Sequence, residues 1–234
     1  MKRTRALLPL LLLAGLAHAQ ENFDYHVADV GLLQAKVVQT EVGITAAERA
    51  KMNVAAAAYR GKVAEYGKQL KALGQATPDA ARMRAMFDVL KKDALAVLTP
   101  AQIRRVRELT LQRLGLISLT DPVVAKRVGL SDAQVGQLKA AFQKGRTNFQ
   151  ALQQTAQKAA MPVVAQYKDR KPKNQAEADA LRKEVAAKLK PVQVRFLPQM
   201  QAVGKQTDTA MLAVLTPAEK AAWTALKGKP FAAK

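Results

Sequence analysis

One short motif occurs four times in this chain, and this repetition constrains the fold more than any other feature of the sequence. Each copy reads apolar residue, Thr or Ser, two residues, then Gln or Glu, as in Leu98-Thr99-Pro100-Ala101-Gln102. The spacing is that of a capping box, in which the hydroxyl accepts from the third backbone N–H of a new helix and the Gln or Glu accepts from the N-cap N–H. The motif therefore predicts four helix starts. Their structural cap residues are Thr45 with Glu48, Thr99 with Gln102, Ser131 with Gln134, and Thr216 with Glu219.

The four copies alternate between two types, which indicates an internal duplication. Val42-Gly43-Ile44-Thr45 is matched by Val128-Gly129-Leu130-Ser131, and Leu95 to Pro100 is matched by Leu212 to Pro217. Between them, apolar residues recur with 4-3 spacing from Met52 to Leu73, as on one stripe of a long helix. The same positions 86 residues later are apolar with the exception of Gly145. The sequence predicts an all-α protein of two tandem helical-hairpin units with long helices.

The second hairpin is expected to be the longer one, by 31 residues that lie around Lys168 to Gln201. Pro162, Pro191 and Pro198 fall within this region and are expected to kink or break its helices, since proline lacks an N–H and clashes with the preceding turn.

The N-terminus is typical of a secretory signal peptide. Lys2, Arg3 and Arg5 precede a short apolar run, and Ala17-His18-Ala19 is a small-x-small cleavage site. We therefore expect a periplasmic or otherwise exported protein after cleavage near Ala19. With no Cys in the chain, its stability must come from packing and helix capping. The expected organisation is 1–19 signal peptide, 20–41 lead-in segment, 42–120 first unit, 121–228 second unit and 229–234 tail.

Charge is the second strong signal. The formal net charge is +20, and +17 remains without Lys2, Arg3 and Arg5. A field of this size favours anionic partners, such as acidic unfolded chains, phospholipid head groups, acidic wall polymers or nucleic acid. Part of the charge also serves to solvate long helix faces, and charge alone does not choose among these roles.

The sequence lacks the catalytic residues that most enzyme classes need. After the leader the chain holds one His, two Ser and no Cys, so a Ser-His-Asp, Cys-His or His/Cys metal site has almost nothing to build from. No Gly-rich phosphate loop occurs. We therefore expect no enzyme, cofactor or metal. His26 is expected at the surface of a loosely ordered segment, and Trp223 is expected to be a core or docking residue.

The paired Leu-Thr-x-x-Gln motifs behind a leader resemble the Spy/CpxP family of periplasmic proteins. The resemblance covers roughly Thr45 to Leu226, with Glu48 and Glu219 in place of the family's Gln and Ser131 in place of its Thr. These replacements preserve the capping role. The family's thin, curved, cradle-like all-α dimers imply that two units in one chain would form an elongated monomer similar to such a dimer. Metal-binding relatives rely on His-containing segments that this chain lacks.

The resemblance implies an ATP-independent chaperone, or holdase, that binds unfolded or aggregation-prone envelope proteins on a basic, partly apolar concave surface, with a preference for acidic clients and no need for nucleotide. From charge density, the candidate client-binding residues are Arg60, Lys62, Lys68, Lys71, Lys144, Arg146, Lys168, Arg170, Lys171, Lys173, Arg182 and Lys183. Two alternatives stay open: a polyanion-binding module for envelope polymers or nucleic acid, and an envelope-stress regulator that docks on a membrane sensor. Client identity, the binding face and further dimerisation also stay open.

Overall fold

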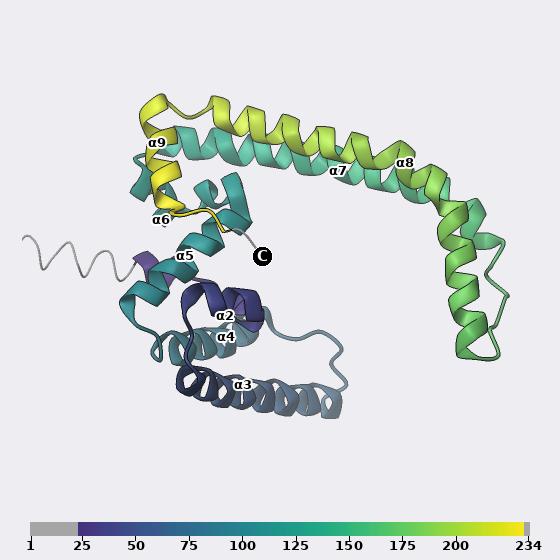
Figure 1. Ribbon diagram of the computed structural model, residues 1–234, viewed down its shortest axis with the longest axis horizontal. Helices are drawn as coiled ribbons and strands as arrows, with labels where there is room; N and C mark the ends of the chain where they lie inside the picture. Colours follow the sequence, from purple (N-terminus) through teal and green to yellow (C-terminus); the bar gives the residue numbers. More distant parts are fainter. Residues whose placement is uncertain (1–22, 232–234) are drawn as a thin grey trace, which may run out of the picture. The chain divides into compact units, whose positions relative to one another are not determined.

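The computed structural model describes residues 23–231, and within this range every regular element is a helix, so the all-α prediction is confirmed (Figure 1). The predicted signal peptide lies outside the described residues. The elements are η1 (Val30–Gln34), α2 (Lys36–Val42), α3 (Ala46–Ala72), α4 (Ala80–Leu95), α5 (Pro100–Leu114), η2 (Gly115–Thr120), α6 (Pro122–Val128), α7 (Asp132–Ala165), α8 (Gln175–Ala213) and α9 (Pro217–Leu226).

Contacts divide the chain into two compact units. The first unit consists of the chain up to Gly115 together with the segment from Trp223 onward. The second unit runs from Leu116 to Ala222. This division differs from the predicted one, in which the chain up to residue 228 belongs to the second unit. The reason is that side chains of α5 bind backbone carbonyls near the C-terminus: Arg107 donates to Leu226 O, and Gln112 donates to Lys227 O at 2.7 Å.

The elements of the first unit recur in the second at a fixed offset. The seven-residue helices α2 and α6 begin at 36 and 122, and the long helices α3 and α7 begin at 46 and 132, so each pair is 86 residues apart. Gly43 and Gly129 end α2 and α6 with positive φ angles of 73° and 91°, a conformation that suits glycine because it has no Cβ. The repeated sequence thus produces the same helix, turn, helix geometry twice.

The capping boxes form as predicted, and within each unit two of them bind each other. In the first unit, Gln102 Nε2 donates to Glu48 Oε2 at 3.2 Å and to Gly43 O at 3.1 Å. In the second unit, Gln134 Nε2 donates to Glu219 Oε2 at 2.9 Å and to Val214 O at 3.2 Å. One amide and one carboxylate therefore join the start of each unit's first long helix to the start of its last helix.

The lead-in is part of the first unit's core, which corrects the expectation of a loosely ordered segment. Residues 23–27 form a helical turn, and Phe23, Ala28 and Leu33 are buried. The Asp24 carboxylate lies 3.0 Å from Arg107 Nε, and both side chains are only 5% exposed. This ion pair could not be predicted from local sequence patterns, because its partners are 83 residues apart.

The tail is also anchored as far as it is described. Lys229 O accepts from Arg105 at 2.7 Å, and Phe231 N–H donates to Gln112 Oε1 at 2.9 Å. The Phe231 side chain packs against the core that contains Val106 and Leu109. Trp223 is buried as well.

In the second unit, α7 and α8 lie side by side as a long hairpin (Figure 1). The two helices approach each other closely at Gly145, where an added Cβ would lie 2.1 Å from Thr207 Oγ1. The one interruption of the apolar stripe is therefore a point of close approach. The prolines were expected to kink or break the helices, and they do not break them. Pro162 lies inside α7, and Pro191 and Pro198 lie inside α8. Figure 1 shows α8 bending between its green first part and the remainder.

Candidate functional site

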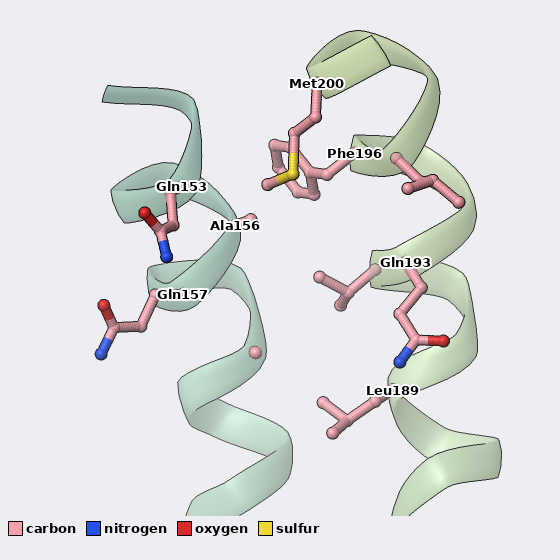
Figure 2. Close-up of a pocket in the computed structure, with 10 residues that line it drawn as sticks. Gln153, Ala156, Gln157, Leu189, Gln193, Phe196 and Met200 are labelled. Carbon is pink, nitrogen blue, oxygen red and sulfur yellow. The ribbon is translucent and has the colours of Figure 1, made fainter. Parts of the chain in front are cut away.

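An apolar groove separates α7 from α8 in the distal part of this hairpin, with a volume of about 670 Å³ (Figure 2). Its α8 wall carries large apolar side chains, and Leu189, Phe196 and Met200 point across the groove in Figure 2. Its α7 wall carries alanines, including Ala156, that are too short to fill the space. The full lining set is Gln153, Ala156, Gln157, Ala160, Leu189, Val192, Gln193, Phe196, Leu197 and Met200.

The local sequence explains why the groove forms. On α8 the large residues Leu189, Val192, Phe196 and Met200 recur at intervals of three or four residues, so they share one helix face. The facing positions on α7 are small residues one turn apart. Large residues opposite small ones usually interdigitate in a core. Here the helices leave a groove beside the stripe, in which Phe196 is buried and Leu189, Val192 and Met200 are half-buried.

The polar residues of the lining are three exposed glutamines, Gln153 and Gln157 from α7 and Gln193 from α8. In Figure 2 the Gln157 amide lies on the side of α7 that faces away from α8. A glutamine amide both donates and accepts hydrogen bonds, as a peptide group does. No charged side chain is among the lining residues. A ligand of this groove would therefore place apolar groups on its floor and neutral hydrogen-bonding groups at the amides.

The helix segments around the groove carry only positive charge. No acidic residue occurs from 133 through 168 or from 185 through 207, whereas the same stretches hold nine basic residues. Four of them, all exposed, come close in sequence to lining residues: Lys158, Lys188, Lys190 and Arg195. The Arg195 guanidinium carbon lies 5.2 Å from the ring centre of Phe196, which brings one charge to the edge of the groove.

Large apolar side chains are also exposed on the same part of the hairpin. Met161 is 61% exposed and Val164 51% on α7, while Val194 is 64% exposed and Leu197 56% on α8. Each pair is three residues apart on its helix and so shares one face. Exposed apolar groups that lie next to each other are typical of a surface that binds other molecules.

The predicted client-binding cations are all exposed, and they are distributed over both units and several elements. In the first unit, Arg60, Lys62, Lys68 and Lys71 lie along α3, where Lys68 pairs with Glu65 at 3.7 Å. In the second unit, Lys144 and Arg146 lie on α7, with about 30 Å of helix between them and its end. The others follow: Lys168, Arg170, Lys171 and Lys173 in the connection to α8, and Arg182 and Lys183 on α8 itself.

Two of these cations in the second unit are engaged by carboxylates, in addition to Lys68 in the first unit. Arg170 Nη1 lies 2.8 Å from Glu184, and Arg182 Nη1 lies 3.2 Å from Asp179. The pKa of Glu184 is lowered, first by the hydrogen bond from Arg170 and then by one from the Tyr167 hydroxyl. These pairs leave Lys168, Lys171 and Lys173 as the stronger anion-binding groups of the connection.

Sequence reasoning missed the groove because it ranked residues by charge. Of the lining residues, the predicted stripe included only Ala156. The signal that could have found the site was the pairing of a large apolar stripe on one helix with small residues on the other, within a segment free of acids.

Comparison with known proteins does not identify a relative: no family model matches the chain, and no similar protein is found among curated proteins or solved structures. Among the described residues, no helix is long and apolar enough to cross a membrane. No group of three or more His, Cys, Asp or Glu side chains in residues 23–231 is placed to hold a metal ion.

Proposed function

We propose that this protein is an ATP-independent holdase of the periplasm, which binds unfolded or aggregation-prone envelope proteins and prefers acidic ones. One observation carries the proposal: the α7–α8 hairpin combines an open apolar groove, exposed apolar side chains and flanks without acidic residues. Unfolded chains expose apolar segments that a folded protein buries. A surface that combines positive charge with exposed apolar groups attracts an acidic chain at long range and then retains its apolar side chains.

The resemblance to the Spy/CpxP family supports the same proposal through the motifs. The four capping boxes of the prediction are formed, and they position the ends of each unit's helices. Their side chains are committed to these structural bonds. We therefore assign the motifs to the fold and the hairpin surface to client binding, with no catalytic residue.

Aggregation suppression tests the proposal. Purified protein is mixed with a chemically unfolded client, and light scattering is followed without ATP at low and high salt. We expect suppression at near-stoichiometric ratios, more strongly for an acidic client, with a partial loss at high salt because screening weakens only the charged contribution. If neither acidic nor neutral clients are protected, the holdase proposal is wrong.

A polyanion-binding function is the second candidate, and the basic connection from Lys168 to Lys173 favours it. A polyanion releases counterions on binding, so its affinity falls steeply and continuously with salt. Steep loss of binding to an anionic polymer, with no protection of neutral unfolded chains, would favour this function over the holdase.

A further inference from the structure

We propose that the α7–α8 groove binds short apolar peptide segments flanked by acidic residues, and that this groove is the client-recognition element of the holdase. The inference rests on the proposed function for its biological role, but the binding site itself is defined by the groove. The pocket between α3 and α4 in the first unit has a different chemistry, because Lys62, Glu65 and Arg82 are among its lining residues.

The groove's size limits what it can accept. From Leu189 to Met200 the α8 wall extends over about 16 Å, at roughly 1.5 Å per helical residue. An extended peptide rises about 3.3 Å per residue, so about five residues would occupy the groove. The volume of about 670 Å³ falls within the usual range for ligand pockets, so several apolar side chains fit within it.

The chemistry of the lining favours a peptide over a simple lipid. A fatty acyl chain offers no hydrogen-bonding group to the exposed amides of Gln153, Gln157 and Gln193, whereas a peptide backbone offers both N–H and C=O groups to them. The charged groups lie outside the groove and are all positive, so acidic residues on either side of the apolar segment complement Lys158, Lys190 and Arg195.

The test uses three fluorescent peptides with the purified protein and measures affinity by anisotropy. The first has an apolar core of Leu, Val and Phe between Glu flanks, the second has the same core between Lys flanks, and the third has a Ser/Asn core between Glu flanks. We expect the first peptide to bind roughly tenfold more tightly than either of the others (about 1.4 kcal/mol). Equal binding of all three would overturn the inference.

A filled groove provides the second arm. The double variant Ala156→Leu/Ala160→Leu places apolar side chains of the protein itself into the groove, and leucine is a good helix former. Ala159→Leu is the matched control, since Ala159 is an exposed residue of α7 outside the lining set. We expect the double variant, but not the control, to bind the first peptide roughly tenfold more weakly. Retained binding in the double variant would show that the site lies elsewhere.

Aggregation suppression by the same variants separates the two proposals. If the unmodified protein protects no client, the holdase proposal fails whatever the peptides do. If it protects clients and the filled-groove variant protects them equally well, the holdase proposal stands and the groove inference is wrong.

A different observation carries a second inference, which concerns how two similar units avoid mispairing in one chain. In the first unit the acid belongs to the first motif (Glu48) and the amide to the second (Gln102), whereas in the second unit Gln134 comes first and Glu219 second. We infer that this exchange is a pairing code. A crossed arrangement would bring Glu48 against Glu219, and two carboxylates at hydrogen-bond distance do not both ionise without a large cost.

In the observed pairs, hydrogen bonds connect each acid and amide both to its own capping box and to each other. Gln102 Oε1 accepts from Thr99 N–H at 2.8 Å, while Glu48 Oε2 accepts from Thr45 N–H at 2.8 Å, and the Gln102 amide N–H joins the two boxes. The second unit repeats this pattern with Gln134 accepting from Ser131 N–H at 2.9 Å and Glu219 from Thr216 N–H at 2.7 Å. A crossed carboxylate pair has no N–H to place between its oxygens.

Exchange of the residues tests the code directly. Glu48→Gln/Gln102→Glu keeps one acid and one amide in each unit but makes both crossed pairs complementary. We expect near-normal equilibrium stability, together with several-fold more misassembled or dimeric protein after rapid dilution from denaturant, measured by size-exclusion chromatography. The quadruple variant, which adds Gln134→Glu/Glu219→Gln, restores the rejection of crossed pairs and should refold as the unmodified protein does. Normal refolding of the double variant, or equal defects in both variants, would overturn the inference.

Discussion

A methyl group added at Gly145 tests the close approach of α7 and α8 that precedes the groove. A Cβ at this position would lie 2.1 Å from Thr207 Oγ1, 2.7 Å from Thr207 Cγ2 and 2.9 Å from Thr207 Cβ. Rotation of the Thr207 side chain relieves only part of this overlap, because its Cβ does not move. Rotation also breaks the 2.8 Å hydrogen bond that the Thr207 hydroxyl donates to Val203 O.

Two opposing effects set the magnitude. Overpacking of a well-fitted contact costs about 1–3 kcal/mol, whereas alanine in place of glycine inside a helix contributes about 1 kcal/mol in the other direction. We therefore expect Gly145→Ala to lower the free energy of unfolding by about 0–2 kcal/mol. Gly136→Ala is the matched control, because Gly136 lies on the same helix and an added Cβ would meet nothing within 4 Å. It should raise stability by about 1 kcal/mol.

Urea unfolding followed by far-UV circular dichroism measures both variants. The decisive quantity is the difference between them, for which we expect about 1–3 kcal/mol with Gly145→Ala the less stable. Addition of Thr207→Ser removes the methyl group at 2.7 Å and should recover part of the loss. If Gly145→Ala stabilises the protein as much as Gly136→Ala does, α7 and α8 do not approach as closely as described.

Three further predictions concern the elements that hold each unit together. Arg107→Ala removes the closer of two guanidinium groups that pair with the buried Asp24 carboxylate, and leaves Arg104 Nε at 3.6 Å from it. In thermal unfolding it should lower the free energy of unfolding by about 1.5–3 kcal/mol, the usual contribution of a hydrogen bond to a charged group, and a loss below about 0.5 kcal/mol would contradict a stabilising role of the pair. Thr99→Ala removes a cap and should cost about 1 kcal/mol, with Thr99→Ser retaining most of the stability; equal losses would refute the capping role. The pKa of Glu219 is lowered, first by the hydrogen bond from the Thr216 backbone, so the stability it contributes is present above the ordinary value of 4.5 and is lost as pH falls through the lowered pKa. Glu219→Gln should therefore show a weaker loss of melting temperature in acid, and parallel pH profiles would contradict this assignment.

Local sequence signals predicted the helices well because capping is a local interaction. The hydroxyl and the Gln or Glu of each box lie three residues apart, so the start of α5 at Pro100 could be inferred without knowledge of the rest of the chain. Gly43 and Gly129 were likewise visible as repeated turn residues.

Long-range pairing could not be inferred in the same way. The Asp24–Arg107 ion pair and the binding of Leu226 O by Arg107 join residues 83 and 119 positions apart, and nothing in the local sequence specifies such partners. The groove was missed for a related reason. Whether Phe196 fills a core or lines an open groove depends on how far apart two helices settle, and the spacing of apolar residues along one helix does not determine that distance.

Site-specific crosslinking tests the central claim, that clients bind at the α7–α8 groove, most directly. The chain has no cysteine, so Ala160→Cys introduces a single site in the groove for a photoreactive label, and Ala101→Cys on α5 provides an exposed control in the first unit. A chemically unfolded acidic client should crosslink to the label at position 160, and an excess of the apolar peptide with Glu flanks should abolish that product. Equal crosslinking at both positions, or a product that the peptide does not reduce, would contradict the account.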